Sequence, residues 1–151
     1  MRTTPRFGRL FLLLAGWLGV AGACGPAMAA QPPAVLNYQG VLRDAGGAPR
    51  DGSFDMVFRF FDAAALGNEI LVDEHRSIGT GAVTVARGLF NAALGGGSVM
   101  DGGAALPNDP YTSLSQVFRD FSTVYMEVQV GGETLAPRIQ VVAAAYALNA
   151  D

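Results

Sequence analysis

Hydrophobic and polar side chains alternate along most of the chain after residue 35, and an alternation with a period of two predicts β-strands. The segment LNYQGVLR places Leu36, Tyr38 and Leu42 on one face and mainly polar side chains on the other. The segment SFDMVFRFFD has the strongest pattern, because Phe58 and Phe60 share a face with other large apolar residues. We predict that this second segment is a single strand whose aromatic face forms the core.

Two further segments predict β-hairpins. In VTVARGLFNAAL the chain turns at Arg87-Gly88, and we expect a loop longer than two residues because arginine is poorly suited to positive φ. In TVYMEVQVGGETLAPRIQVV the turn is Gly131-Gly132, where both residues can adopt positive φ. Pro137 cannot donate to a sheet ladder, so the returning strand should lie at an edge of the sheet or bulge there.

The segment EILVDEHRSI predicts a weaker strand, with Ile70 and Val72 on one face and Asp73 and His75 on the other. Residues 95–111 are rich in glycine, proline and aspartate, and they predict a long irregular loop. A loop of this length inside a small domain is usually functional or poorly ordered.

The segment TSLSQVFRDF predicts the one helix. Its residues Leu114, Val117 and Phe121 fall on one helical stripe, and Thr112 or Ser113 is suited to the N-cap position. Together these patterns predict a mainly β fold of about seven strands and one short helix. Strands at this spacing bury one face against a second sheet, so we expect an antiparallel β-sandwich.

Residues 1–29 predict a cleaved signal peptide. Three arginines within the first nine residues precede an uncharged, mainly apolar run, and the segment AMA before Ala30 fits a signal-peptidase site. The apolar run is about 14 residues, shorter than the roughly 20 of a membrane-spanning helix. We therefore expect export by the Sec route to the periplasm, the cell surface or the medium, with a sandwich domain over residues 30–142. The alternatives are a retained anchor helix and lipidation at Cys24.

The charge of the expected mature chain argues against nucleic acid and anionic lipid as partners. Three of the ten basic residues lie in the leader and the chain has no lysine, so seven arginines face 13 acidic residues and the net charge is −6. An acidic chain without a basic cluster is poorly suited to polyanions. Cleavage before Ala30 would also remove Cys24, leaving no disulfide and no thiol chemistry.

The sequence predicts no catalytic, cofactor-binding or metal-binding set. His75 is the one histidine, and without further histidine or cysteine ligands we expect it to be structural or solvated. Ser98 lacks the Gly-x-Ser-x-Gly spacing of a nucleophile elbow. Asp101, Asn108 and Asp109 could offer oxygens to Ca²⁺, but the calcium-loop pattern is incomplete and turn formation accounts for these residue types.

Tyr111 and Tyr125 remain as candidate ligand contacts, together with Asp101 and Asp109, because a sugar can stack on an exposed aromatic ring. Tyr125 falls on the polar face of its strand and could be exposed. We favour instead that it covers this face beneath the predicted helix, because an amphipathic helix must pack somewhere.

Four segments, NYQGVLRDAGGAPRDG, GLFNAALG, VYMEVQVGGETLAPR and AYALNA, occur in this order between Asn37 and Ala150. Together they resemble the N-terminal β-sandwich module of large secreted or surface proteins of bacteria. The pattern of that module runs from Tyr-Gln-Gly through Gly-x-Phe and Gly-x-x-Leu-x-Pro-Arg to Pro-Tyr-Ala, and this chain departs from it at Ala145. The resemblance implies a module whose Tyr-Ala segment leads into repeats, a stalk or a trimerising, tail-fibre-like region.

Residues 143–151 accordingly predict a connector or tail that leads away from the sandwich, with a frayed end as the alternative. The expected function is a non-enzymatic structural or interaction module of a cell-surface or stalk-bearing protein. Its expected partner is a surface glycan or another protein, and oligomerisation would occur through a C-terminal region beyond the sandwich. A carbohydrate-binding module and a small secreted hydrolase built on residues 95–111 are the alternatives.

Overall fold

The computed structural model describes residues 34–141, and within this range the chain forms nine β-strands and one short α-helix. The elements are β1 (Leu36–Val41), β2 (Gly52–Phe54), β3 (Met56–Phe61), β4 (Glu69–His75), β5 (Val83–Ala86), β6 (Leu89–Leu94), β7 (Ser98–Asp101), α1 (Leu114–Asp120), β8 (Val124–Val130) and β9 (Glu133–Val141). The expected signal peptide, Cys24 and the expected connector lie outside the described residues.

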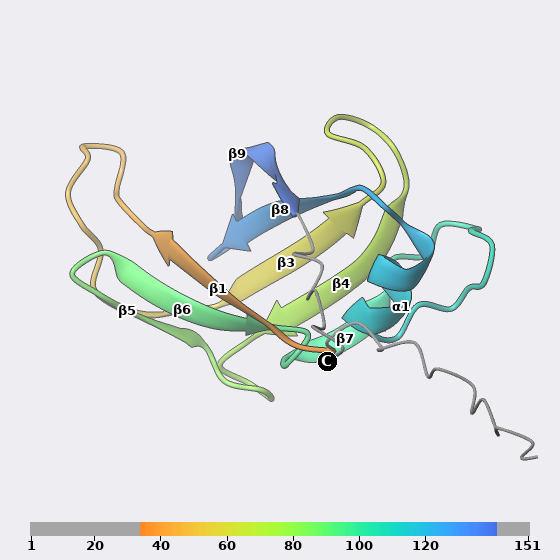
Figure 1. Ribbon diagram of the computed structural model, residues 1–151. Helices are drawn as coiled ribbons and strands as arrows, with labels where there is room; N and C mark the ends of the chain where they lie inside the picture. The colour runs from red at the N-terminus through yellow and green to blue at the C-terminus, as the bar shows by residue number, and fades with distance from the viewer. Residues whose placement is uncertain (1–33, 142–151) are drawn as a thin grey trace, which may run out of the picture.

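The strands form two antiparallel sheets that pack as a sandwich (Figure 1). The first sheet has the order β1-β6-β5-β2, and the second has the order β7-β4-β3-β8-β9. This confirms the predicted mainly β, antiparallel sandwich with one short helix. The described residues contain nine strands rather than seven because one predicted strand is divided and residues 95–111 contain a strand.

The divided strand is the segment SFDMVFRFFD, where the prediction of a single strand was wrong. β2 pairs with β5 in the first sheet, whereas β3 pairs with β4 and β8 in the second. Asp55 lies between them, and its carboxylate accepts the backbone N–H of Ser77 at 2.7 Å. The chain crosses between the sheets at Asp55 without breaking the alternation of apolar side chains, so the alternation could not reveal the crossing.

β3 is the central strand of its sheet and carries much of the core. Met56, Phe58 and Phe60 are fully buried, as predicted. Phe61 points to the opposite face and is also buried, because the guanidinium of Arg138 lies 3.3 Å from the centroid of its ring. A strand buried on both faces anchors the second sheet.

β4 brings two polar side chains into the core. Asp73 is completely buried and His75 is 8 % exposed, although polar residues opposite Ile70 and Val72 would ordinarily face water. The ladder between β3 and β4 shifts register near its end, and Ile70 joins Leu71 in the core as a result. Both faces of β4 are therefore largely covered.

The β5–β6 hairpin has a two-residue turn, so the longer loop expected from Arg87 was wrong. Arg87 and Gly88 have φ values of 52° and 80°. The N–H of Arg87 donates to the Asp51 carboxylate at 2.6 Å, and the N–H of Gly88 donates to the carbonyl of Arg50 at 2.8 Å. Contacts from a distant segment thus hold arginine in a conformation that its own preference disfavours.

The β8–β9 hairpin agrees with the prediction. Gly131 and Gly132 form a two-residue turn with φ values of 56° and 92°. β9 is the last strand of its sheet, and its register against β8 shifts between Met126 and Val128, opposite the part of β9 that contains Pro137. We predicted that this strand lies at an edge of the sheet or bulges, and the structure has both features.

The helix closes the side of the sandwich next to β4 and β7 (Figure 1). Its N-cap is Ser113, whose hydroxyl accepts the N–H of Gln116 at 3.4 Å, and its buried residues Leu114 and Val117 belong to the main core. α1 is short, and within residues 34–141 no helix has the length and apolar character needed to cross a membrane.

Candidate functional site

An apolar hollow lies on the opposite side of the sandwich, between β1 at the edge of the first sheet and β9 at the edge of the second. Its volume is about 280 Å³. We call it the edge groove, and its lining comes from both sheets: Tyr38, Gly40, Val41, Phe90, Met126, Val128, Leu135, Ala136, Pro137 and Ile139.

The floor of the edge groove depends on a glycine. Gly40 pairs with Phe90 across the β1–β6 ladder, and a Cβ on Gly40 would come within 2.4 Å of the Phe90 ring. The ring can lie across β1 only because this side chain is absent. Tyr38 packs beside it, with its ring centroid 5.9 Å from that of Phe90 and 6.1 Å from that of Phe58. Burial raises the pKa of the Tyr38 hydroxyl above its ordinary value of 10.0.

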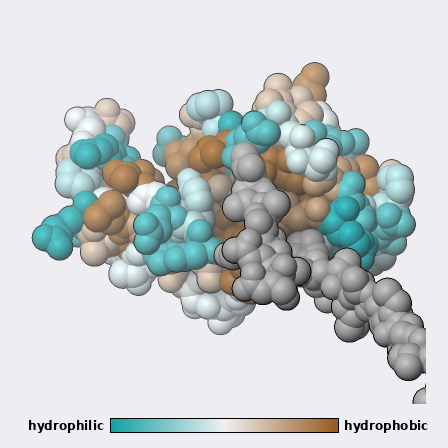
Figure 2. Space-filling view, viewed as in Figure 1, coloured by the Kyte–Doolittle hydropathy of each residue, from teal (hydrophilic) through white to brown (hydrophobic). Residues whose placement is uncertain are grey.

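The rim of the edge groove is apolar and exposed. Val41, Leu135 and Ile139 are 58 %, 38 % and 45 % exposed. Figure 2 shows hydrophobic surface gathered across the middle of this face. Among the described strands, β1 and β9 each have a neighbour on one side only, so their outer backbone groups can accept another strand. Apolar surface next to an open edge is typical of a site that another segment covers.

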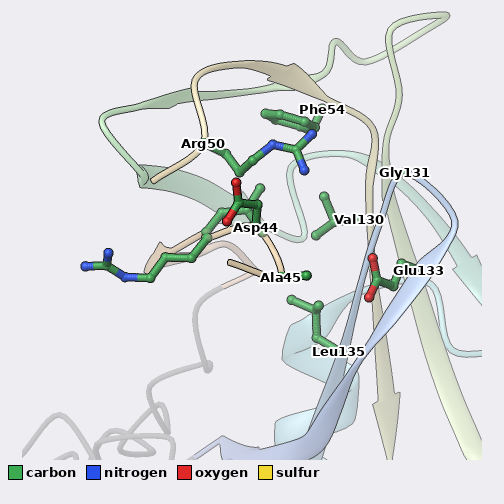
Figure 3. A pocket seen from close by; sticks show the side chains of 10 residues that line it. Asp44, Ala45, Arg50, Phe54, Val130, Gly131, Glu133 and Leu135 are labelled. Atoms are coloured by element: carbon green, nitrogen blue, oxygen red, sulfur yellow. The ribbon is translucent and has the colours of Figure 1, made fainter. Parts of the chain in front are cut away.

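A second hollow of about 440 Å³ adjoins the edge groove, and Leu135 lines both. We call it the end hollow. It lies between the segment that links β1 to β2 and the β8–β9 hairpin. In Figure 3, side chains from the two segments face each other across it: Asp44, Ala45 and Arg50 on one wall, and Val130, Glu133 and Leu135 on the other.

The end hollow is more polar than the edge groove. The guanidinium of Arg50 lies 4.9 Å from the centroid of the Phe54 ring. The Asp44 Oδ1 accepts the N–H groups of Gly46 and Ala48 at 2.9 and 2.8 Å, so this carboxylate shapes the loop. Arg50 and Glu133 place opposite charges around one hollow. The end hollow could therefore hold polar groups of a ligand whose apolar part lies in the edge groove.

The family model described as Domain of unknown function (DUF8740) matches residues 37–138, which is more than half of the chain. The chain belongs to this family. No curated protein and no solved structure matches the chain. The DUF8740 segment begins in β1 and ends at Arg138 in β9, so it contains every residue that lines the edge groove except Ile139.

Arg138, the last residue of the DUF8740 segment, fixes β9 from the face opposite the groove. Its Nε donates to Glu127 Oε2 at 3.2 Å, and its Nη1 donates to the carbonyls of Ala63 at 3.2 Å and Leu66 at 2.6 Å. Sequence reasoning had not assigned Arg138 a role. The alternation along β9 could have indicated this role. Arg138 points to the opposite face from Ile139, and that face of the sheet also carries Glu127 of β8.

Three of the four predicted ligand-contact residues lie at the end of β7 and in the loop that leads from it to α1. The N–H of Tyr111 donates to Asp101 Oδ1 at 2.9 Å, and the Asp109 carboxylate accepts the N–H of Leu106 at 2.6 Å. Both carboxylates thus serve the fold of the loop, which agrees with the turn-forming explanation of these residues. Within residues 34–141, no group of three or more histidine, cysteine, aspartate or glutamate side chains is placed to hold a metal ion.

Tyr111 is buried rather than presented to a ligand. It is 1 % exposed, and its hydroxyl, which has a single proton to donate, lies 2.6 Å from the carbonyl oxygen of Pro107 and 3.1 Å from Asp120 Oδ2. Burial, with a further contribution from the hydrogen bond to Asp120, raises the pKa of Tyr111. In the described conformation this ring offers no open face on which a sugar could stack.

Tyr125 lies apart from the other three residues. It is half-buried on the outer face of β8 and pairs with Phe61 of β3. The helix packs on the core between the sheets through Leu114 and Val117, and Tyr125 is not part of that core. The helix therefore does not pack over Tyr125 as we had expected.

His75 is structural, one of the two outcomes expected from the sequence. Its Nε2 lies 3.0 Å from Asp73 Oδ2, and its ring meets Phe58 edge to face with centroids 5.6 Å apart. The Asp73 carboxylate also accepts the N–H groups of Gly95 at 2.6 Å and Gly97 at 3.0 Å. This pair therefore holds the connection between β6 and β7 against β4.

Proposed function

We propose that this DUF8740 chain is an exported, non-enzymatic structural or interaction module of a cell-surface or stalk-bearing protein. The observation that supports it most is the edge groove, an apolar hollow bordered by two strands with open edges. Such a surface is suited to receiving a polypeptide segment, because backbone hydrogen bonds and alternate side-chain pockets are both available. The arginine-rich leader supports the export part of the proposal.

The side chains that could take part in catalysis form hydrogen bonds within the fold, and this supports a non-enzymatic role. Asp73 and His75 are bound to each other, and Asp101, Asp109 and Tyr111 are held by internal hydrogen bonds. Across the described residues, no buried side-chain nitrogen or oxygen lacks a hydrogen-bond partner. A catalytic side chain ordinarily faces a pocket that the substrate can reach, and its hydrogen-bonding groups are not all occupied by the fold.

Export is tested by expressing the full chain with its own leader in a Gram-negative bacterium and determining the N-terminus of the exported protein by mass spectrometry. We expect the mature chain to begin at Ala30 or Gln31. A lipid-modified N-terminus at Cys24 would replace this prediction with a lipoprotein. An intact leader on protein retained in the cytoplasm would overturn the proposal of export.

The surface role is tested with the parent gene in its own cells. Protease added to intact cells should digest the protein if it is displayed outward, while a periplasmic marker stays intact. Broad screens with ester, glycoside and peptide substrates should give no turnover. Turnover that disappears in Ser98→Ala would instead support the hydrolase built on residues 95–111.

Carbohydrate binding remains as a second candidate, and it rests on Tyr125 because this ring is partly exposed while Tyr111 is buried. Glycan-array binding by the full chain that is lost in Tyr125→Ala and kept in Gln129→Ala, on the same face of β8, would favour it. Equal binding by both variants, or none by the unaltered chain, would count against it.

A further inference from the structure

We propose that residues 142–150 of this same chain fold back from the end of β9 and dock in the edge groove, with Tyr146 and Leu148 as the anchoring side chains. This inference concerns the folding of the isolated chain and stands whether or not the chain is displayed on a cell surface. It replaces the expectation of a connector that leads directly away from the sandwich.

The first argument is the unfilled apolar surface. The hollow is lined by aromatic and aliphatic side chains such as Tyr38, Phe90 and Met126, and its volume of about 280 Å³ exceeds that of several water molecules. Leu135 and Ile139 point to the side of β9 that bears the core, since they pair with Val128 and Met126, yet they are 38 % and 45 % exposed. Core-facing residues left this open indicate that a covering segment belongs there.

The second argument is the pattern of the segment that follows. From residue 142 the sequence reads VAAAYALNAD. Val142, Tyr146 and Leu148 share one parity with two alanines, while the other parity holds only alanine, asparagine and aspartate. An extended segment with this alternation has one large apolar face and one small or polar face. That is the pattern of a strand that buries one side and leaves the other in water.

The third argument is reach. Val141 lies in β9 only two residues beyond Ile139, which lines the groove. Tyr146 is five residues beyond Val141, and an extended chain covers up to about 17 Å over that distance. The alanines between them provide small residues for a reversal of direction. The segment can therefore return to the groove from which β9 emerges, at a lower entropic cost than an occupant from another molecule.

Nuclear magnetic resonance of the full chain tests the proposal directly. We expect nuclear Overhauser contacts from the ring protons of Tyr146 to the methyl groups of Met126 and Ile139. The Tyr146→Ala and Leu148→Ala variants should shift these methyl signals and lower the melting temperature by about 3–6 °C each. Asn149→Ala, which changes the opposite face of the segment, is the matched control and should leave both unchanged.

A mixed sample of two differently labelled chains separates docking within one molecule from docking between copies. Contacts seen only between differently labelled chains would overturn the proposal in favour of exchange between copies. An absence of contacts, together with melting temperatures for Tyr146→Ala and Leu148→Ala that equal those of the unaltered chain, would overturn it outright. The export and display experiments do not depend on either result, so the two proposals can fail separately.

Discussion

The two sides of the sandwich differ in which side chains they bury and which they expose. On the helix side, formed by β4, β7 and α1, the polar groups Asp73 and Tyr111 are buried and fully bonded. On the groove side, formed by β1, β8 and β9, apolar groups such as Leu135 and Ile139 remain exposed. A buried polar group must form specific hydrogen bonds, because leaving it unpaired is costly. An exposed apolar group instead favours binding, because covering it removes apolar surface from water. The polar groups of the helix side thus stabilise the fold, whereas the apolar groups of the groove side can bind another segment.

Phe58 lies between the two sides, and its removal should have the largest effect. The ring packs edge to face on Tyr38 of the groove side and on His75 of the helix side. We expect Phe58→Ala to lower the free energy of unfolding by about 3–5 kcal/mol, as for other buried aromatic residues. Urea denaturation measures this, with the exposed Leu89→Ala as control. A Phe58→Ala midpoint equal to that of the control would show that the two sides do not share a core.

Asp73→Ala tests the helix side alone. The change leaves the partly buried N–H groups of Gly95 and Gly97 and the His75 ring without their acceptor, so we expect a loss of about 3 kcal/mol. Asp44→Ala is a matched control, because Asp44 also accepts two backbone N–H groups but is exposed to water. Equal losses in the two variants, measured by urea denaturation, would mean that burial adds nothing on this side.

Gly40→Ala tests the floor of the groove side. The added methyl group meets the Phe90 ring, which must shift, so we expect a loss of about 2 kcal/mol and a changed tyrosine signal from Tyr38. In Gly46→Ala the nearest atom is an Asp44 carboxylate oxygen at 3.4 Å, and the effect should be under about 1 kcal/mol. Thermal melting and near-ultraviolet circular dichroism provide the measurements. A Gly40→Ala protein as stable as Gly46→Ala would mean that the groove floor is not tightly packed.

Acid should produce the smallest effect, through Asp120 on the helix side. The hydrogen bond from Arg119, with further ones from Asn108 and Tyr111, lowers the pKa of Asp120 from 3.8 to about 2. A carboxyl group with a lowered pKa in the folded state stabilises the fold above its ordinary pKa and loses this contribution as the pH falls through the lowered value. The stability difference between the unaltered chain and Asp120→Asn should therefore shrink between pH 4 and pH 2 in urea titrations. A constant difference across this window would contradict the assignment.

Local patterns were sufficient to predict most elements of the fold. Gly131-Gly132 specified its turn, and the stripe of Leu114 and Val117 specified the helix, because both signals lie within a few residues. β7 was missed because the glycines beside it indicate a loop, and its strand character comes from pairing with β4. The burial of Asp73 could not be foreseen, because its partners Gly95 and Gly97 are remote in sequence.

The edge groove was likewise beyond prediction from the sequence. Its walls come from β1, β6, β8 and β9, and only the packing of the two sheets places Tyr38 near Ile139. Several of the lining residues lie in the Tyr-Gln-Gly, Gly-x-Phe and Leu-x-Pro-Arg segments that carry the resemblance, but nothing in the sequence indicated that these segments meet. By contrast, the four residues selected as ligand contacts were chosen for their side-chain chemistry, and the fold uses three of them internally.

The crossing at Asp55 also affects when the domain can fold during synthesis. The chain enters the first sheet, leaves it after Phe54 and starts the second sheet, in which Phe58 pairs with Val128. The first sheet meanwhile needs Leu94 to pair with Leu36. Neither sheet is complete until distant parts of the chain have been made, and such a high contact order makes folding slow. A nascent chain of this topology should therefore stay open until the β8–β9 hairpin has been synthesised and can complete the second sheet.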